Sequence, residues 1–383
     1  MRAYVFTDRA LEQQAGRFVW LQIDTEKAGN APLREKFPVV ALPTYFIVNP
    51  ADESVALRWV GGATVSQLQG MLDDGRRAVL AGAAGGATAS RAERAFARAE
   101  RLYGAGDNAG AAAAYGEALA QAAGGWPRYA RAVESLLFAL QSTGDDERAA
   151  RLAAQAFPRL RRTPSAANVA ASGLGSALEL PAEHGARDSL IAVLEADTRE
   201  VVSDRGIPLA ADDRSAAYIA LLEARAAAHD SLGALRVASE WAAFLEGEAA
   251  RAKTPEARAV FDSHRLSAYL ELDQPGRALP MLTASERDLP GDYNPPARLA
   301  IAYLAMHRWD EALAASDRAL AKAYGPRRLR ILDTRADIQV GRSDVPAARR
   351  TLEDAIRIAE ALPAGQRSES SIAGLKQKLD ALP

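Results

Sequence analysis

Cysteine is absent from the 383 residues of the sequence. A disulfide, a zinc site with thiolate ligands and a cysteine nucleophile are therefore excluded for the chain as given. Histidine is scarce as well. The four histidines lie far apart, and none has a second histidine at the three- or four-residue spacing that puts two ligands on one helix face. These absences predict a protein without a metal site or a cofactor.

The net charge is also small. Lysine and arginine number 47 against 49 acidic residues, which leaves a formal charge of −2 and no global field to attract nucleic acid or anionic lipid. No run of 18 apolar residues occurs, and the first residues do not form a charged-then-apolar leader. We therefore expect no nucleic-acid partner, no membrane span and a cytoplasmic location for the chain as it stands.

The motifs of common enzyme classes are missing too. The sequence contains no Walker-type loop, no Gly-x-Ser-x-Gly elbow and no complete dinucleotide-binding glycine motif. Asp262, Ser263 and His264 are the residue types of a catalytic triad, but neighbours on a helix point in different directions. We expect no catalytic residue in this chain.

The composition changes near residue 81. Before it, short runs of β-branched and aromatic residues are separated by turn formers, and after it alanine, leucine, arginine and glutamate recur at helical spacing. Residues 81–90 are rich in glycine and alanine, which is typical of a flexible linker. The sequence therefore predicts an α/β domain at 1–80 and an all-α region at 91–383, with a chain that is mostly helical overall.

The first domain reads as alternating short helices and strands. Hydrophobic runs predict two strands buried on both faces and one alternating edge strand, and capping residues predict the helices. The expected order is helix 9–15 capped by Asp8, strand 18–23, helix 31–37, strand 44–48, edge strand 54–60, and a helix that starts at Thr64 or Ser66 and runs to about residue 80.

Three motifs in this region resemble the thioredoxin superfamily, most closely bacterial thioredoxin-like proteins. They are Asp24-Thr-Glu-Lys27, Ala41-Leu-Pro-Thr-Tyr45 and Val60-Gly-Gly62. The resemblance covers about a fifth of the chain and implies a thioredoxin-like fold. It implies a cis peptide bond before Pro43, and it marks Leu42, Pro43 and Thr44 as the place where the family binds an extended peptide.

The sequence departs from this family at its active site. The family's Cys-x-x-Cys and the central strand before it have no counterpart here, and Met1–Phe6 resembles the last turns of the helix that carries them. Two explanations stay open. A start assigned too late would make the protein a thiol–disulfide oxidoreductase, located in the periplasm if the lost residues include a signal peptide. A degenerate domain with an incomplete sheet would instead be a redox-inactive peptide-binding or structural module.

The helical region contains repeats with a small-residue signature. Ala278, Ala312 and Ala348 lie 34 and 36 residues apart, and Gly106-Asp107 is echoed by Gly144-Asp145. Small residues at this period allow two helices to cross closely, and the units resemble tetratricopeptide repeats. The clearest repeats span about 91–160 and 260–360, whereas residues 164–248 are helical in pattern but irregular in register.

Stacked helix pairs of this kind form a solenoid with a groove that binds a segment of a protein partner. The repeat register predicts a set of groove residues with mixed charge: Phe96, Glu100, Glu134, Phe138, His264, Arg298, Ile301, Asp333 and Asp337. The sequence thus predicts a protein-binding scaffold with a protein or peptide partner. The alternative is an oxidoreductase whose repeats deliver protein substrates to a redox site outside the given residues.

Overall fold

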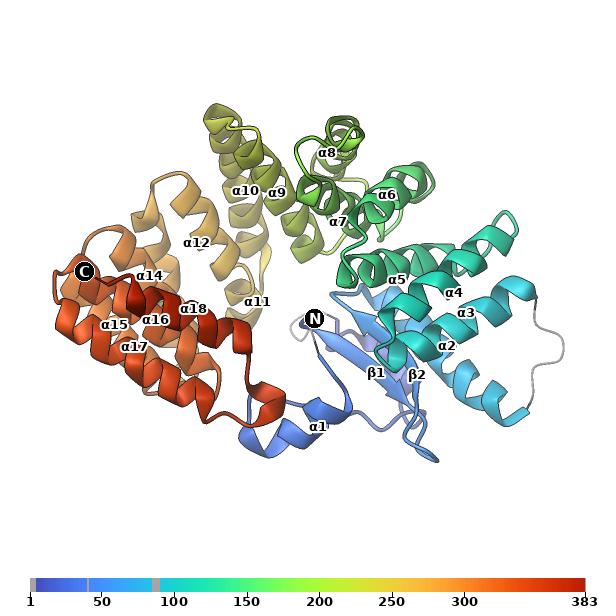
Figure 1. The fold of residues 1–383 in the computed structure, drawn as a ribbon, viewed down its shortest axis with the longest axis horizontal. Coiled ribbons are helices and arrows are strands. Elements are labelled where there is room, and N and C mark those ends of the chain that lie inside the picture. Colours follow the sequence, from blue (N-terminus) through green and yellow to red (C-terminus); the bar gives the residue numbers. More distant parts are fainter. Residues whose placement is uncertain (1–4, 40, 85–89, 383) are drawn as a thin grey trace. The chain divides into compact units, whose positions relative to one another are not determined.

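A computed structural model of the chain describes residues 5–39, 41–84 and 90–382. The described residues are mostly helical, with one two-stranded antiparallel sheet (Figure 1). They form two compact units, residues 1–15 with 40–237 and residues 16–39 with 238–383. Each unit therefore combines a part of the N-terminal region with a series of helix pairs.

The first unit contains the sheet and the first helix pairs. Its elements are the 3₁₀ helix η1 (Arg9–Gln14), β1 (Thr44–Val48), β2 (Val55–Val60), α2 (Val65–Ala84), α3 (Arg91–Gly104), α4 (Asn108–Gln121), α5 (Tyr129–Ser142), α6 (Asp146–Leu160), α7 (Ala166–Glu179), α8 (Arg187–Ser203), α9 (Ala211–Ala227) and the start of α10 (Ser231–Arg251). The predicted linker begins inside α2, and its residues 85–89 lie outside the described residues. The irregular region 164–248 also folds into helix pairs.

The second unit contains the C-terminal helix pairs. Its elements are η2 (Ala28–Asn30), α1 (Ala31–Lys36), the rest of α10, α11 (Pro255–Ala259), α12 (Asp262–Glu271), η3 (Pro275–Ala278), α13 (Leu279–Asp288), α14 (Asn294–Ala305), α15 (Trp309–Leu320), α16 (Arg327–Gly341), α17 (Val345–Glu360), η4 (Ala364–Gln366) and α18 (Glu369–Asp380). Consecutive helices pack against each other through the series α14 to α18. The predicted repeats at 260–360 are thus helix pairs.

Most N-terminal elements confirm the sequence prediction. The carboxylate of Asp8 accepts a hydrogen bond from the backbone N–H of Ala10 (2.8 Å) at the start of η1. Thr64 and Gln67 cap α2 reciprocally, each side chain accepting from the other's backbone N–H (3.2 and 2.9 Å). The peptide bond between Leu42 and Pro43 is cis, as the resemblance implied.

The predicted strand at 18–23 is wrong. Residues 18–24 belong to no helix or strand, and the side chains of Val19 and Leu21 are 88% and 79% exposed. Strand formation requires a neighbouring strand to accept and donate backbone hydrogen bonds, and none pairs with this run among the described residues. The thioredoxin-like sheet is accordingly not seen, because β1 and β2 alone form the sheet of the described residues.

The two strands form a hairpin, residues 44–60, against the helices of the first unit. Thr44 pairs with Val60 and Ile47 with Leu57, and the register shifts after Ile47. The turn is closed by the backbone N–H of Asn49, which donates to the carbonyl of Ser54 (2.9 Å). β2 contacts both α2 and α3, so the hairpin lies between these helices.

A common turn joins the two helices of many pairs. One residue with positive φ ends the first helix, and the next backbone N–H donates to a carbonyl five residues earlier, which is the Schellman arrangement. The positive-φ residues are Gly106, Gly144, His229, Asp273, His307 and Ser343. This turn explains why the dipeptide Gly-Asp occurs at both 106–107 and 144–145. Glycine adopts positive φ at no steric cost, and the carboxylate of Asp107 caps the next helix by accepting a hydrogen bond from the backbone N–H of Gly110 (2.8 Å).

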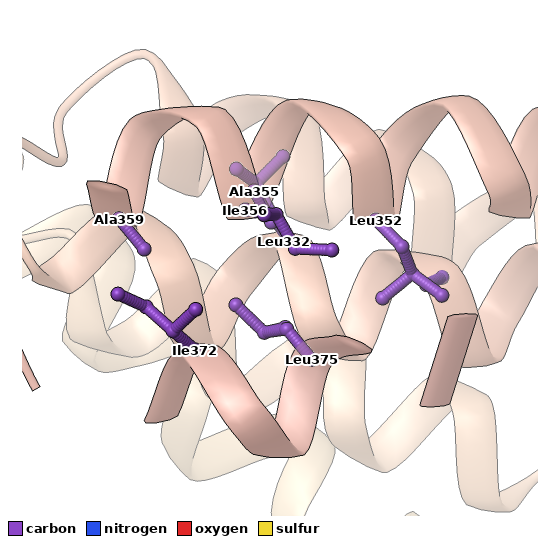
Figure 2. Packing of buried hydrophobic residues seen from close by; sticks show 8 residues of the cluster. Leu332, Leu352, Ala355, Ile356, Ala359, Ile372 and Leu375 are labelled. Carbon is purple, nitrogen blue, oxygen red and sulfur yellow. The ribbon is translucent and has the colours of Figure 1, made fainter. Parts of the chain in front are cut away.

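The core consists of small and branched side chains at the helix crossings. The predicted crossing residues Ala278, Ala312 and Ala348 are fully buried. At the C-terminal end, α16, α17 and α18 enclose a cluster formed by Leu332, Ala336, Leu352, Ala355, Ile356, Ala359, Ile372 and Leu375 (Figure 2). This packing confirms the reason for the small-residue period, because a larger side chain at the crossings would push the helices apart.

The segment at 24–36 binds the last helices of its own unit. Arg327 of α16 contacts the carboxylates of both Asp24 (3.1 Å) and Glu26, and the hydroxyl of Tyr324 donates to Asp24. The side-chain amide of Gln366 donates to the carbonyls of Thr25 and Lys27 (3.1 and 2.8 Å). Residues 24–36 are therefore an integral part of the second unit.

Candidate partner-binding surface

The groove residues predicted in the first repeats are largely buried. Phe96 of α3 is 2% exposed, and its ring contacts those of Tyr115 and Trp126 edge-on, with centroids 5.8 and 5.5 Å apart. Glu100, one turn later, is 6% exposed and accepts a hydrogen bond from the hydroxyl of Tyr115 (2.7 Å). Both side chains belong to the packing between α3, α4 and α5 and are not free for a partner.

A buried ion cluster links α2, α3 and α5. Arg131 of α5 pairs with Glu100 and with Asp74 of α2, the latter at 3.2 Å. Burial raises the pKa of Glu100, and the charge of Arg131 acts in the opposite direction. The cluster holds α2 against the first helix pairs, which gives Glu100 a structural role.

The hairpin covers Phe138, another predicted groove residue, which lies on α5. Arg58 of β2, only 4% exposed, lies over the rings of Tyr103 and Phe138, with its guanidinium carbon 4.7 and 5.8 Å from the two centroids. One guanidinium nitrogen donates to the carbonyl of Tyr103 (3.2 Å). A side chain of the protein itself thus occupies the aromatic surface at Phe138.

Glu134 lies in the same first unit and is also buried, at 8% exposure. The side-chain amide of Asn168 on α7 lies 3.5 Å from its carboxylate, and Ser165 also hydrogen-bonds to it. Burial raises the pKa of Glu134 to about 7, and the nearby charge of Asp213 contributes in the same direction. Burial thus favours the protonated form of the Glu134 carboxyl group.

The predicted residues of the second unit lie on neighbouring helices. His264 is on α12, Arg298 and Ile301 on α14, and Asp333 and Asp337 on α16; α14 contacts both other helices. We call these five residues the second-unit groove. Lys378 of α18 extends the row, because its ammonium pairs with Asp333 (2.5 Å) and Asp337 (2.7 Å) while both carboxylates stay 45% exposed.

A surface cavity of about 500 Å³ opens beside this groove. Arg298 lines it together with residues of α11 and of the connection between α13 and α14, including Glu256, Asp292 and Asn294. Asp292 already accepts hydrogen bonds from Asn294, from the backbone N–H (2.9 Å) and the side-chain amide (2.8 Å). The cavity therefore presents one guanidinium together with three carboxylates, those of Glu256, Asp288 and Asp292.

Arg298 is electrostatically unusual. Burial lowers the pKa of its guanidinium, and the charges of Asp262 and Asp292 oppose this shift. Within the described part of the chain, however, Arg298 forms no ion pair and no side-chain hydrogen bond. Asp262 instead accepts from the hydroxyl of Ser285 (2.6 Å). A desolvated arginine without a partner favours binding of an anionic group.

The residues around the cis proline lie at the base of the hairpin. Leu42 is 69% exposed, and the carbonyl of Pro43 accepts from the backbone N–H of Gly61 (2.8 Å). The hydroxyl of Thr44 donates to the carbonyl of Ala41 (2.6 Å). The role of Leu42, Pro43 and Thr44 in peptide binding stays a prediction.

Neither a metal centre nor a membrane-crossing helix is found in the described ranges. No group of three or more acidic or histidine side chains there comes together as metal ligands do. No helix among residues 5–39, 41–84 and 90–382 combines the length and apolarity that a bilayer crossing requires.

The comparisons with known proteins identify the repeats. Residues 293–361, which include α14 to α17, match the family model of the tetratricopeptide repeat. No curated protein matches the sequence.

Several solved structures are similar to the chain. A tetratricopeptide repeat protein from Parabacteroides merdae is 12% identical, with 76% of this chain and 99% of that chain covered and a TM-score of 0.46. The TPR2AB domain of yeast Sti1 in complex with pHSP90 is 16% identical, with coverages of 76% and 97% and a TM-score of 0.29. Yeast Tom70 is 10% identical, with coverages of 80% and 85% and a TM-score of 0.23. All three TM-scores are below 0.5, so the repeat assignment rests on the match at 293–361.

Proposed function

We propose that the protein is a non-catalytic scaffold that binds a segment of a protein partner through the second-unit groove. The observation that carries this proposal is Arg298, a desolvated guanidinium that lines a cavity and has no ion-pair partner among the described residues. Tetratricopeptide repeats at 293–361 support it, since stacked repeats present such surfaces to partner segments.

The first-unit residues are less suited to this role. Phe96, Glu100 and Glu134 are buried, and Arg58 of the hairpin covers the ring of Phe138. A partner would have to displace the hairpin to reach them. In the second-unit groove, Lys378 forms salt bridges with Asp333 and Asp337, and the ring of Trp241 lies 5.8 Å from that of His264.

The chemistry of the groove defines the partner. Arg298 selects a carboxylate, and the exposed carboxylates of Asp333 and Asp337 select a basic side chain. We therefore propose a peptide segment that carries both an acidic and a basic residue, bound with Ile301 as an apolar contact between them. Its sequence signature would be an acidic residue separated from a lysine or arginine.

A random peptide library tests this function. The full chain is expected to enrich peptides with acidic residues, and Arg298→Ala should abolish that enrichment while Asp333→Asn with Asp337→Asn removes the basic preference. The matched control is Arg318→Ala, which removes an arginine of α15 that already pairs with Glu286 (2.8 Å). Equal enrichment by the wild type and Arg298→Ala, or no enrichment by either, contradicts the proposal.

We propose further that residues 1–80 derive from a thioredoxin-like domain that acts here without redox chemistry. The order of η1, α1, β1, β2 and α2 and the motif before β1 support this relationship. The alternative, a thiol–disulfide oxidoreductase, requires cysteines that these 383 residues do not contain. We propose a cytoplasmic location for the chain as given and the periplasm for the oxidoreductase alternative.

Translation of the DNA upstream of Met1 distinguishes the two. An in-frame strand followed by Cys-x-x-Cys, together with insulin-reduction activity of the extended protein alone, supports the oxidoreductase. An in-frame stop, or no activity of the extended form, supports the scaffold.

A further inference from the structure

The turn at residues 24–27, which we call the acidic turn, lies against a group of polar residues in the second unit. These residues come from the loop before α16, from α16 itself and from η4, and we call them the clamp. The clamp consists of Tyr324, Gly325, Arg327 and Gln366. Arg327 contacts the carboxylates of Asp24 and Glu26, and the hydroxyl of Tyr324 donates to Asp24. The clamp shares no residue with the second-unit groove, so it is a site separate from the function proposed above.

The clamp also contacts the backbone of the acidic turn. The side-chain amide of Gln366, which is 4% exposed, donates to the carbonyls of Thr25 (3.1 Å) and Lys27 (2.8 Å). The carbonyl oxygen of Glu26 approaches Gly325 so closely that a side chain at 325 would collide with it. Two carboxylates and three consecutive carbonyls are thus in contact with the clamp, which suits the sequence Asp-x-Glu in this conformation.

Aromatic rings position the guanidinium of Arg327. Its central carbon lies 4.4 Å from the ring centroid of Tyr324 and 5.3 Å from that of Tyr293. Stacking fixes the plane of the guanidinium and removes part of its water, which strengthens its hydrogen bonds to carboxylates. Both rings come from the helical region, so this positioning does not require the acidic turn.

The acidic turn is held in shape by its own hydrogen bonds. The carboxylate of Asp24 accepts from the backbone N–H of Glu26 (3.0 Å), and its carbonyl accepts from the side-chain amide of Asn30 (2.8 Å). The backbone N–H of Asn30 donates to the carbonyl of Lys27 (2.9 Å). Because these bonds are local, a short peptide with this sequence favours the same shape and loses less conformational entropy on binding.

The acidic turn and α1 bury little apolar surface. Ala31 is the buried apolar residue of 24–36, and the side chain of Leu33 is 40% exposed. Apolar burial supplies most of the stability of a protein core, so a contact made mainly by polar groups opens more readily. Such a contact can be exchanged for an equivalent one from another molecule.

We propose that the clamp binds an acidic turn of a protein partner, with the sequence Asp-x-Glu, and that the chain's own acidic turn occupies the clamp in the absence of that partner. Charge complementarity supports this partner, since Arg327 faces two carboxylates at once. The chain's own turn competes at an effective concentration of about millimolar. It therefore restricts binding to partners that add further contacts around the turn.

Fluorescence anisotropy of a labelled peptide tests this proposal. The peptide contains residues 22–37 of the chain with blocked ends. In the full chain, Asp24→Asn with Glu26→Gln removes both carboxylates of the chain's own turn and keeps the shape of the side chains. This double variant should bind the peptide about tenfold or more tightly than the wild type does, because the competitor is weakened. Addition of Arg327→Ala should abolish binding, and a peptide that carries the same two substitutions should not bind.

Arg330→Ala in the double variant is the matched control, because Arg330 is an exposed arginine of the same helix. It should leave the peptide affinity unchanged, and thermal unfolding followed by circular dichroism verifies the fold of each variant. A folded double variant that does not bind the peptide overturns the proposal, as does binding that survives Arg327→Ala.

If the double variant does not fold, the wild type decides, and absence of binding up to about 1 mM peptide overturns the proposal. Sedimentation equilibrium tests a second copy as the occupant. A wild-type dimer that Arg327→Ala dissociates would assign the clamp to a second copy and overturn the assignment to a partner.

Discussion

Replacement of Arg58 by alanine should release the hairpin from the helices of the first unit. The guanidinium lies over two aromatic rings, at 4.7 Å from the centroid of Tyr103 and 5.8 Å from that of Phe138, and donates to the carbonyl of Tyr103. Desolvated cation–π contacts contribute about 2 kcal/mol, and a hydrogen bond from a charged donor contributes about 1.5–3 kcal/mol. The buried Nε of Arg58, which lacks a hydrogen-bond partner among the described residues, offsets part of this sum. We expect a net loss of about 3 kcal/mol.

Hydrogen exchange measures this loss directly. An opening equilibrium weakened by about 3 kcal/mol exposes the backbone amides of β2 roughly a hundredfold more often. Mass spectrometry of peptides that cover Val55–Val60 should therefore show faster exchange in Arg58→Ala, while the helices α14 to α17 keep their wild-type protection. A global denaturation curve is less informative, because repeat proteins can unfold in parts.

Arg98→Ala is the matched control. Arg98 lies on α3, which β2 contacts, but its side chain is 49% exposed and pairs with Glu117 at the surface, where an ion pair contributes about 1 kcal/mol or less. Its β2 amides should exchange as in the wild type. If the β2 amides exchange as slowly in Arg58→Ala as in the wild type, the contacts of Arg58 with Tyr103 and Phe138 do not hold the hairpin. The explanation for the covered ring of Phe138 is then refuted.

Four further substitutions test the stability argument. Glu134→Gln should remove a pH dependence: the raised pKa of about 7 means that the folded protein keeps a proton which the unfolded chain loses near 4.5, so wild-type stability falls as pH rises between these values. In urea denaturation, the free energy of unfolding of the variant should equal that of the wild type near pH 4.5 and exceed it by about 1–3 kcal/mol above pH 7. The same pH dependence of this free energy in both proteins would contradict the raised pKa of Glu134. Ser343 is exposed and has a φ of 65°, so Ser343→Gly should stabilise the protein by about 0.5–1 kcal/mol. Gly144 has a φ of 72°, so Gly144→Ala should destabilise the protein by about 1 kcal/mol. If calorimetry shows that both substitutions change the stability in the same direction, the argument from positive φ in the turns is refuted. Leu352→Ala should cost about 2–5 kcal/mol by opening a cavity between α16, α17 and α18, seen as lost hydrogen-exchange protection in these helices and not in α3 to α6.

The sequence by itself determined the local structure of this protein. Capping residues such as Asp8 and Thr64, the alternation of 54–60 and the alanine period at 278, 312 and 348 predicted elements that the structure contains. These signals succeed because they act between residues close in the chain, or because close helix crossing admits only small side chains. The Schellman turns could have been found in the same way only where glycine marks them, since His229, His307 and Ser343 give no such signal.

Only the tertiary structure decided which surfaces are available. The run at 18–23 has the composition of a buried strand, but burial requires a neighbour, and the described residues supply none. Likewise, Phe96 and Arg298 occupy comparable positions in the repeat pattern, yet one is packed in the core and the other lines a cavity. The difference arises from contacts between residues far apart in the chain, such as Arg58 with Phe138, which carry no periodic signal.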